Sequence, residues 1–337
     1  MPTDRSETGP PATPARQAFT AAVDGLAAQL RQDRSILAAI LCGSLAHDTV
    51  WEKSDVDLVI VTIDEAKVSA DSISLYADGV NVHASLITRA AFRRMAQGSL
   101  QNSFMHALLA KGRLLYTHDE TIARLCESLH DLGARDREVQ LLAAATAVLP
   151  ALYKARKWLV TRRDLEYTAL WLLYTATPLA QIEVIAAGQI AGREVIPDAM
   201  KLNPGLFRIV YTDLLNGPTS RAGIEAALAA VEKYLAARAT ALFAPVLTYL
   251  REAREARACS EIENHFVRNF GFRGVTTACE YLADEKLIGK VSLPARLTKK
   301  SGIAVQELAF VFLDDPAGPA DDDSWAPAPP APRRRRS

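Results

Sequence analysis

Two aspartates, Asp55 and Asp57, carry the clearest chemical signal in the sequence. They stand at the start of an apolar run, Val56 to Val61, which predicts a strand. Because side chains alternate along a strand, both carboxylates are expected on one face, where they repel each other unless a cation lies between them. Mg²⁺ suits such a pair, since it binds protein carboxylates and completes its shell with water and substrate phosphates. The pair therefore predicts a metal site.

A glycine-serine pair, Gly43 and Ser44, lies eleven residues before this dyad and directly after a second apolar run, Leu37 to Cys42. A sharp turn at a glycine leaves backbone N–H groups free, and such a turn suits a phosphate. The alternative is a surface turn followed by a solvated strand end, because aspartates are common near turns. The agreement of turn, spacing and flanking apolar runs favours a site for a metal-bound nucleotide.

The two segments together resemble a known signature. A hydrophobic residue, Gly-Ser, ten intervening residues and Asp-hydrophobic-Asp-hydrophobic form a pattern similar to that of the nucleotidyltransferase superfamily, which includes DNA polymerase beta and the aminoglycoside nucleotidyltransferases. Residues 42–44 and 55–58 carry the resemblance, which extends over about Gln17 to His118.

The resemblance implies an activity and roles for the site residues. A nucleoside monophosphate would pass from an NTP, expected to be ATP, to an acceptor hydroxyl or phosphate, with release of pyrophosphate. Gly43 and Ser44 would hold the β- and γ-phosphates, and Asp55 and Asp57 would hold Mg²⁺. A small-molecule acceptor is expected, an aminoglycoside-like antibiotic being one example by resemblance alone.

The superfamily usually supplies a third carboxylate from a neighbouring strand, where it helps to bind a second metal and activates the acceptor hydroxyl. The corresponding strand here is Gly79 to Thr88, and His83 stands where the acid is expected. An imidazole can accept a proton or bind a metal. The site could therefore use His83, a single metal or a base from elsewhere, or it could be inactive; the alternative for His83 itself is a structural role.

A base from elsewhere is also implied by the resemblance, because in aminoglycoside-type enzymes a helical domain closes over the nucleotide and can supply it. Glu183 and Glu166 are the candidates. Glu183 is preferred because it lies in an otherwise apolar helical segment, and an unpaired buried carboxylate is costly. An ion pair with a nearby arginine or lysine is the alternative.

Length and periodicity predict an α+β fold with several domains. The chain has 337 residues, of which 49% are hydrophobic, which is ample for a large core. The predicted order is a small mixed-sheet nucleotidyltransferase domain, a helical domain and a winged-helix-like C-terminal domain. The expected boundaries are a disordered segment 1–15, the nucleotidyltransferase domain 16–136, the helical domain 137–258, the winged-helix-like domain 259–315 and a disordered tail 316–337.

Individual elements follow from the same patterns. Apolar spacing predicts helices over 16–32, 90–95, 105–110, 141–160, 165–187 and 221–257, a short strand over 113–116, and kinks or breaks at Pro150 and Pro178. Asp78 and Gly79 are predicted to form a turn. The C-terminal order is helix 260–270, turn 271–274, helix 275–285 and hairpin 287–312.

Charge limits the expected partners. The 39 acidic and 39 basic residues balance, so no global surface for nucleic acid or membrane is indicated. Neither a basic groove nor an aromatic stacking series is apparent along the chain, and nucleic acid is not an expected partner. The four cysteines fit no zinc pattern and are interpreted as reduced thiols. We see no signal peptide or membrane span and expect a cytoplasmic protein.

Two rival functions remain open. Lack of the third acid favours a catalytically silent nucleotide sensor or interaction module, whereas retention of both aspartates favours an enzyme. The second rival is nucleotidylation of a protein or RNA end, for which a basic cluster on the C-terminal hairpin, residues 290–300, would be the acceptor contact.

Overall fold

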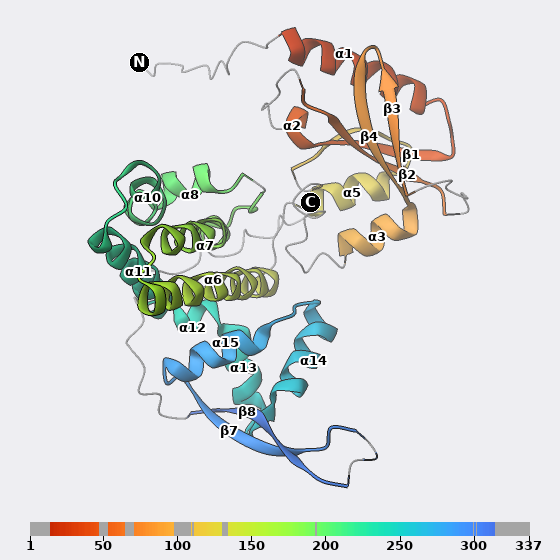
Figure 1. Ribbon diagram of the computed structural model, residues 1–337. Coiled ribbons are helices and arrows are strands. Elements are labelled where there is room, and N and C mark those ends of the chain that lie inside the picture. The colour runs from red at the N-terminus through yellow and green to blue at the C-terminus, as the bar shows by residue number, and fades with distance from the viewer. Residues whose placement is uncertain are drawn as a thin grey trace, which may run out of the picture. The chain divides into compact units, whose positions relative to one another are not determined.

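The computed structural model describes residues 14–46, 53–64, 71–97, 109, 111–129, 134–192, 194–298, 300 and 302–313 (Figure 1). The chain divides into two compact units, Met1–Asp131 and Leu132–Ser337. The predicted disordered ends lie outside the described residues apart from Pro14 and Ala15, and so does the predicted helix 105–110 apart from Leu109.

The first unit is built on a five-stranded mixed sheet. Its strand order is β3-β4-β2-β1-β5, with β2 and β4 parallel and the other neighbours antiparallel. The strands are β1 Ile36–Cys42, β2 Val56–Thr62, β3 Ser72–Ala77, β4 Val80–Thr88 and β5 Arg113–Thr117. The predicted α+β class is confirmed, and four of these strands were predicted.

The register of the sheet aligns four polar or thiol residues. Cys42 pairs with Asp57, Asp57 with His83, and His83 with Ser74. Side chains of directly paired residues on neighbouring strands share one face. The sheet therefore carries a transverse row of these four side chains, which we call the central row.

Helices cover the sheet. They are α1 Pro14–Leu30, the single turn α2 Gly43–Ala46, α3 Arg89–Gln97 and α5 Glu120–Ser128. The lead-in helix and α3 confirm their predictions, whereas α5 was not predicted. Ala22 and Val23 of α1 are fully buried and belong to one core with residues of β1, β2 and β4. Burial of this apolar stripe holds α1 against the sheet.

Strand β3 was also missed by the sequence analysis. It is an edge strand with mostly exposed side chains, so it lacks the apolar run that marked the other strands. Its register comes from the predicted turn at Asp78 and Gly79, which have φ of 47° and 85°. A two-residue hairpin turn of type I′ requires positive φ at both residues, and Asp-Gly is a preferred pair for it.

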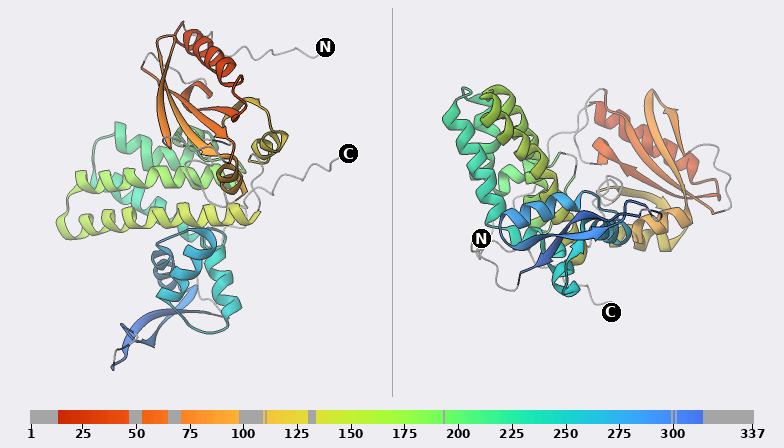
Figure 2. Two further views of the ribbon diagram at one scale, coloured as in Figure 1. Left: turned by 90° about the vertical axis from the view of Figure 1, so that its right-hand side faces the viewer. Right: turned by 60° about the horizontal axis from the view of Figure 1, so that its bottom comes forward.

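The second unit is mainly helical. Its two longest helices, α6 Ala134–Arg162 and α7 Leu165–Ala186, lie side by side (Figures 1 and 2). Pro150 and Pro178 lie inside these two helices. Neither proline breaks its helix, so of the predicted kinks or breaks the breaks are wrong. Pro178 is itself buried. Packing of these long helices therefore outweighs the cost of about 3 kcal/mol for an interior proline.

The predicted helix 221–257 is instead three helices, α11 Arg221–Ala236, α12 Ala239–Leu242 and α13 Ala244–Ala253. Pro245 stands in the first turn of α13, where its missing N–H costs least and its fixed φ favours the start of a new helix. Between α7 and α11 the chain forms α8 Ile196–Leu202, α9 Pro204–Phe207, the π-helical turn η1 Arg208–Thr212 and α10 Asp213–Asn216.

The C-terminal elements follow the predicted order. They are β6 Arg257–Ala258, α14 Cys259–Phe270, α15 Val275–Asp284, β7 Ile288–Ala295 and β8 Val305–Phe312, and the three strands pair in the order β6-β8-β7. The buried cluster that contains α6 and α7 continues through α14, α15 and β8. A separate domain beginning at residue 259 therefore stays a prediction.

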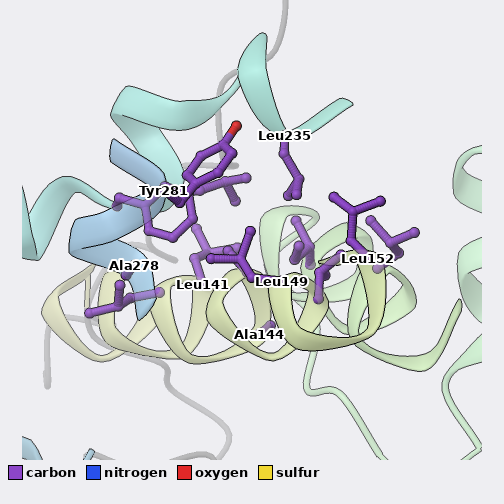
Figure 3. Close-up of a cluster of buried hydrophobic side chains, with 14 of the residues drawn as sticks. Leu141, Ala144, Leu149, Leu152, Leu235, Ala278 and Tyr281 are labelled. Carbon is purple, nitrogen blue, oxygen red and sulfur yellow. The ribbon is translucent and has the colours of Figure 1, made fainter. Parts of the chain in front are cut away.

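The core of this unit is centred on α6. Figure 3 shows Leu141, Leu149 and Leu152 of this helix grouped with Leu235 of α11 and Tyr281 of α15, and all five are buried. One continuous apolar cluster thus joins helices that are far apart in the sequence.

One helix of the described chain, α7, is long and apolar enough by length and composition to cross a membrane. However, 61% of the most apolar stretch of this helix is buried inside the protein. Core helices of soluble proteins have the same length and composition.

We predict opposite effects for alanine at two glycines of the first unit. Gly79→Ala should destabilise the β3–β4 hairpin by about 1 kcal/mol, because a Cβ is disfavoured at positive φ although the space around it is open. Gly25→Ala, in the exposed face of α1, should be neutral or stabilising. Hydrogen exchange of β4 amides would measure both, and equal protection in the two variants would contradict the prediction.

Candidate functional site

The turn at Gly43 fits tightly against the carboxylate of Asp57. Gly43 has φ +69°, and a Cβ placed there would overlap Asp57 Oδ2 and lie 3.2 Å from Asp57 Cγ. Both the backbone conformation and the close approach therefore require glycine. Ser44 follows in the backbone of α2, and its side chain lies outside the described part of the chain.

The two aspartates lie where the polar end of β2 meets solvent. Asp55 is exposed just before the strand, and Asp57 is half-buried as its second residue, whereas the rest of β2 is buried. Burial raises the pKa of Asp57, the charge of His83 lowers it and the negative charge of Asp55 raises it. The net shift in the pKa of Asp57 is upward, so the ionised Asp57 carboxylate is held at a cost in folding free energy.

His83 lies beside both acids. It pairs with Asp57 across β2 and β4, and its Nε2 is 3.5 Å from Asp55 Oδ2. Its Nδ1 is 3.3 Å from Ser74 Oγ on β3. The His83 side chain is 53% exposed, so it can reach a ligand above the sheet. Its place in the central row matches the position at which the sequence analysis expected a third acid.

Cys42 closes the central row on the buried side. Burial, followed by the charges of Asp57 and Cys126, raises the pKa of its thiol to about 12. The thiol therefore stays protonated and adds no anion next to the dyad. All four cysteines are free thiols, as predicted.

The β3 side chains on this face were missed by the sequence analysis, because that strand was not predicted. Ser74 and Tyr76 of β3 and Asn81 of β4 are exposed in the registers next to His83. The missed signal was the alternation of polar and apolar residues over 72–77. This stretch of β3 and β4 carries no lysine or arginine.

Glu183 lies in the second unit, within the core side of α7, and is 8% exposed. Asn203 Nδ2 donates a hydrogen bond to its Oε1 at 3.1 Å. Burial and, next, the charge of Glu183 raise the pKa of Tyr234 well above its usual value. An uncharged amide therefore contacts the carboxylate, and the alternative of an ion pair with a nearby arginine or lysine stays a prediction. Glu166 lies exposed in the first turn of the same helix.

The dyad suits a hard divalent cation. Among the described residues no group of three or more histidine, cysteine or acidic side chains is arranged to hold a metal. Two carboxylates are nonetheless the protein share of a site that also takes water and substrate phosphates. Burial is the largest cause of the upward pKa shift of Asp57, and the negative charge of Asp55 adds to it; a bound cation would favour the ionised carboxylate against both effects.

Comparison with known proteins assigns the fold of this unit. Residues 25–121 match the model of the family described as Polymerase beta, Nucleotidyltransferase. These residues form a polymerase beta-like nucleotidyltransferase domain. The domain contains β1 to β5 and therefore the Gly43 turn, both aspartates and His83.

The rest of the chain also has a structural counterpart. The crystal structure of a nucleotidyltransferase-like protein from Exiguobacterium sibiricum superposes with a TM-score of 0.58, covering 88% of this chain and 99% of that chain at 16% sequence identity. At this identity the likeness shows a shared fold. No protein of curated function matches the chain.

The raised pKa of Asp57 predicts that this site costs stability. An acid whose pKa is higher in the folded state than the unfolded value of 3.8 destabilises the fold once it is ionised. Asp57→Asn should therefore raise the melting temperature at neutral pH. The gain should shrink as the pH falls through the raised pKa and vanish below about 3.8, where both states are protonated.

Asp24→Asn, at an exposed position of α1, is the matched control and should leave the melting temperature unchanged. Differential scanning calorimetry without metal across this pH range would measure both variants. A lower melting temperature for Asp57→Asn at neutral pH would contradict the expectation that the ionised Asp57 carboxylate destabilises the fold.

Proposed function

We propose that the chain is a metal-dependent nucleotidyltransferase that moves a nucleoside monophosphate from an NTP to a small-molecule acceptor and releases pyrophosphate. The observation that carries the proposal is the carboxylate of Asp57 lying against the Gly43 turn, with Asp55 beside it. A scaffold has no physical need for a half-buried carboxylate next to a second one, since burial and, less, the charge of Asp55 raise the pKa of Asp57 and its ionised form costs stability. The nucleotidyltransferase family match supports it.

Each residue of the site has a proposed role. The backbone at Gly43 and Ser44 holds the β- and γ-phosphates, because glycine lets the phosphates approach the main chain. Asp55 and Asp57 would hold Mg²⁺, which, when bound, neutralises charge on the triphosphate and on the leaving pyrophosphate. ATP is the proposed nucleotide. The carboxylates thereby orient the α-phosphorus toward the acceptor.

His83 is the proposed base. As the acceptor oxygen bonds to the α-phosphorus and the bond to pyrophosphate breaks, the hydroxyl proton would pass to the imidazole. Contacts to Ser74 and Asp55 orient the ring within the central row. Glu183, the other predicted base, already accepts a hydrogen bond from Asn203 in its buried position, so its contacts favour a structural role.

The acceptor is proposed to be a small hydroxyl-bearing molecule. The exposed side chains next to His83 are the uncharged Ser74, Tyr76 and Asn81, which can hydrogen-bond a hydroxyl but offer no cation for a phosphate backbone. The proposal includes a cytoplasmic location, where nucleoside triphosphates are supplied. A second candidate, a nucleotide sensor without turnover, is favoured by the histidine in place of a third carboxylate.

We predict that both aspartates are required for nucleotide binding with metal. Calorimetric titration of ATP should show Mg²⁺-dependent heat for the wild type and none for Asp55→Asn/Asp57→Asn, because the cation loses its protein ligands. Asp71→Asn, at an exposed aspartate just before β3, should bind like the wild type. Unchanged binding by the double variant would refute the proposed site.

We also predict that His83 acts in turnover and contributes little to binding. His83→Ala should lower the rate of pyrophosphate release by about 100-fold or more while the affinity for ATP with Mg²⁺ stays within a few fold. His118→Ala, at an exposed histidine of the same unit that lies outside the central row and contacts the Arg31 carbonyl, is the control. The assay uses a panel of hydroxyl-bearing acceptors.

Two other results would redirect the assignment. Loss of turnover in Glu183→Gln with full activity in His83→Ala would make Glu183 the base. ATP binding without pyrophosphate release by the wild type on every acceptor would favour the sensor.

A further inference from the structure

Four aromatic side chains on α6 and α7 form a continuous series in the second unit. Trp158, Tyr167, Trp171 and Tyr174 contact one another edge to face, with successive ring centroids 4.5, 6.1 and 5.4 Å apart. Successive rings lie at 71°, 83° and 84° to each other. We call this set the aromatic series.

The aromatic series lies on the outer side of the helix pair. Tyr167, Trp171 and Tyr174 follow one another at helical spacing on α7, while residues such as Leu172 and Leu179 face the core. Tyr174 is 55% exposed and Tyr167 is 38% exposed. Because α6 and α7 lie side by side along their length (Figures 1 and 2), Trp158 of α6 extends the series across both helices.

Basic side chains accompany the aromatic series. Lys154 Nζ lies 5.9 Å from the centre of the Trp171 ring, and Lys157 follows one turn later on α6. Both lysines are exposed, as are Arg162 and Arg163 at the connection to α7. Within the described part of the chain none of the four forms a salt bridge.

Two acids lie near these four basic side chains and offset part of their charge. Asp164 is engaged as the N-cap of α7, where it accepts a hydrogen bond from Tyr167 N. Glu166 is exposed beside it. Arg156, on another side of α6, pairs with Glu232 of α11. The aromatic series is therefore bordered by an excess of positive charge, which is complementary to a polyanion.

We propose that the aromatic series, together with Lys154 and Lys157, binds single-stranded nucleic acid. The Tyr167 and Tyr174 rings are exposed, whereas the two tryptophans of the series are half-buried. The exposed rings offer surfaces on which unpaired bases stack, and neighbouring cations bind the phosphates. A protein partner fits less well, because lysine is depleted in protein interfaces. In a duplex the faces of the bases are stacked on one another, so they cannot stack on the rings. The surface lies wholly in the second unit, and the inference does not depend on the proposed transferase activity.

The test uses fluorescence anisotropy of a labelled single-stranded oligonucleotide of about 20 mixed nucleotides, as RNA and as DNA, with the full-length chain. Because the arginines at 333–336 could bind a polyanion on their own, all proteins compared carry serine at these four positions. Circular dichroism confirms that each variant is folded.

Affinity should fall about tenfold or more in Lys154→Glu/Lys157→Glu and about tenfold in Tyr174→Ala. The matched controls are Lys201→Glu/Lys233→Glu, which changes the net charge equally on exposed lysines elsewhere in the unit, and Tyr153→Ala, which removes a 40% exposed tyrosine of α6 outside the series. Both controls should bind within about twofold of the parent.

Three results would overturn the proposal. The first is absence of binding to either oligonucleotide at low salt. The second is equal affinity for duplex DNA or heparin with no effect of Tyr174→Ala, which would show non-specific attraction of polyanions. The third is absence of oligonucleotide binding together with a dimer in analytical ultracentrifugation that Tyr174→Ala dissociates, which would make this surface an interface between copies of the chain.

Discussion

The close contact between the Gly43 backbone and the Asp57 carboxylate is the constraint on which the site depends. Antiparallel pairing of β1 and β2 places Cys42 opposite Asp57, and the following residue must turn at φ +69° with no Cβ. A side chain there would push the carboxylate away from the turn. The Gly43 turn can therefore lie this close to the Asp57 carboxylate only without a side chain. The missing side chain also leaves the main chain of the turn open to a ligand.

This arrangement concentrates charge at the end of a buried strand. The remainder of β2 is buried and, apart from Thr62, apolar. The charged groups of this segment therefore lie at its start. The raised pKa of Asp57 means that its ionised form lowers the stability of the fold. His83 partly offsets the cost from β4, and Ser74 holds His83 from the edge strand β3. The site is thus stabilised by four neighbouring strands, which is why the hairpin at Asp78 and Gly79 matters to it.

The second unit uses its long helices in two ways. One side of α6 and α7 supplies the continuous apolar core that reaches α15 and β8. Glu183 is accommodated in that core by the amide of Asn203. The outer side carries the aromatic series and its lysines. Burial of the inner side provides the stability that lets the outer side keep the Tyr167 and Tyr174 rings exposed to solvent.

The sequence by itself determined the features that depend on local spacing: the glycine turn, Asp57 at the start of a buried strand, four strands, the lead-in helix and the helical C-terminal half. Tertiary structure decided the rest. Edge strand β3 has no apolar run, both interior prolines are held in helices by packing, and the partner of Glu183 lies twenty residues away. The aromatic series escaped sequence analysis because Trp158 and Tyr167 meet only when two helices pack. Such contacts depend on residues distant in the chain, and their energies appear only once the fold brings them together.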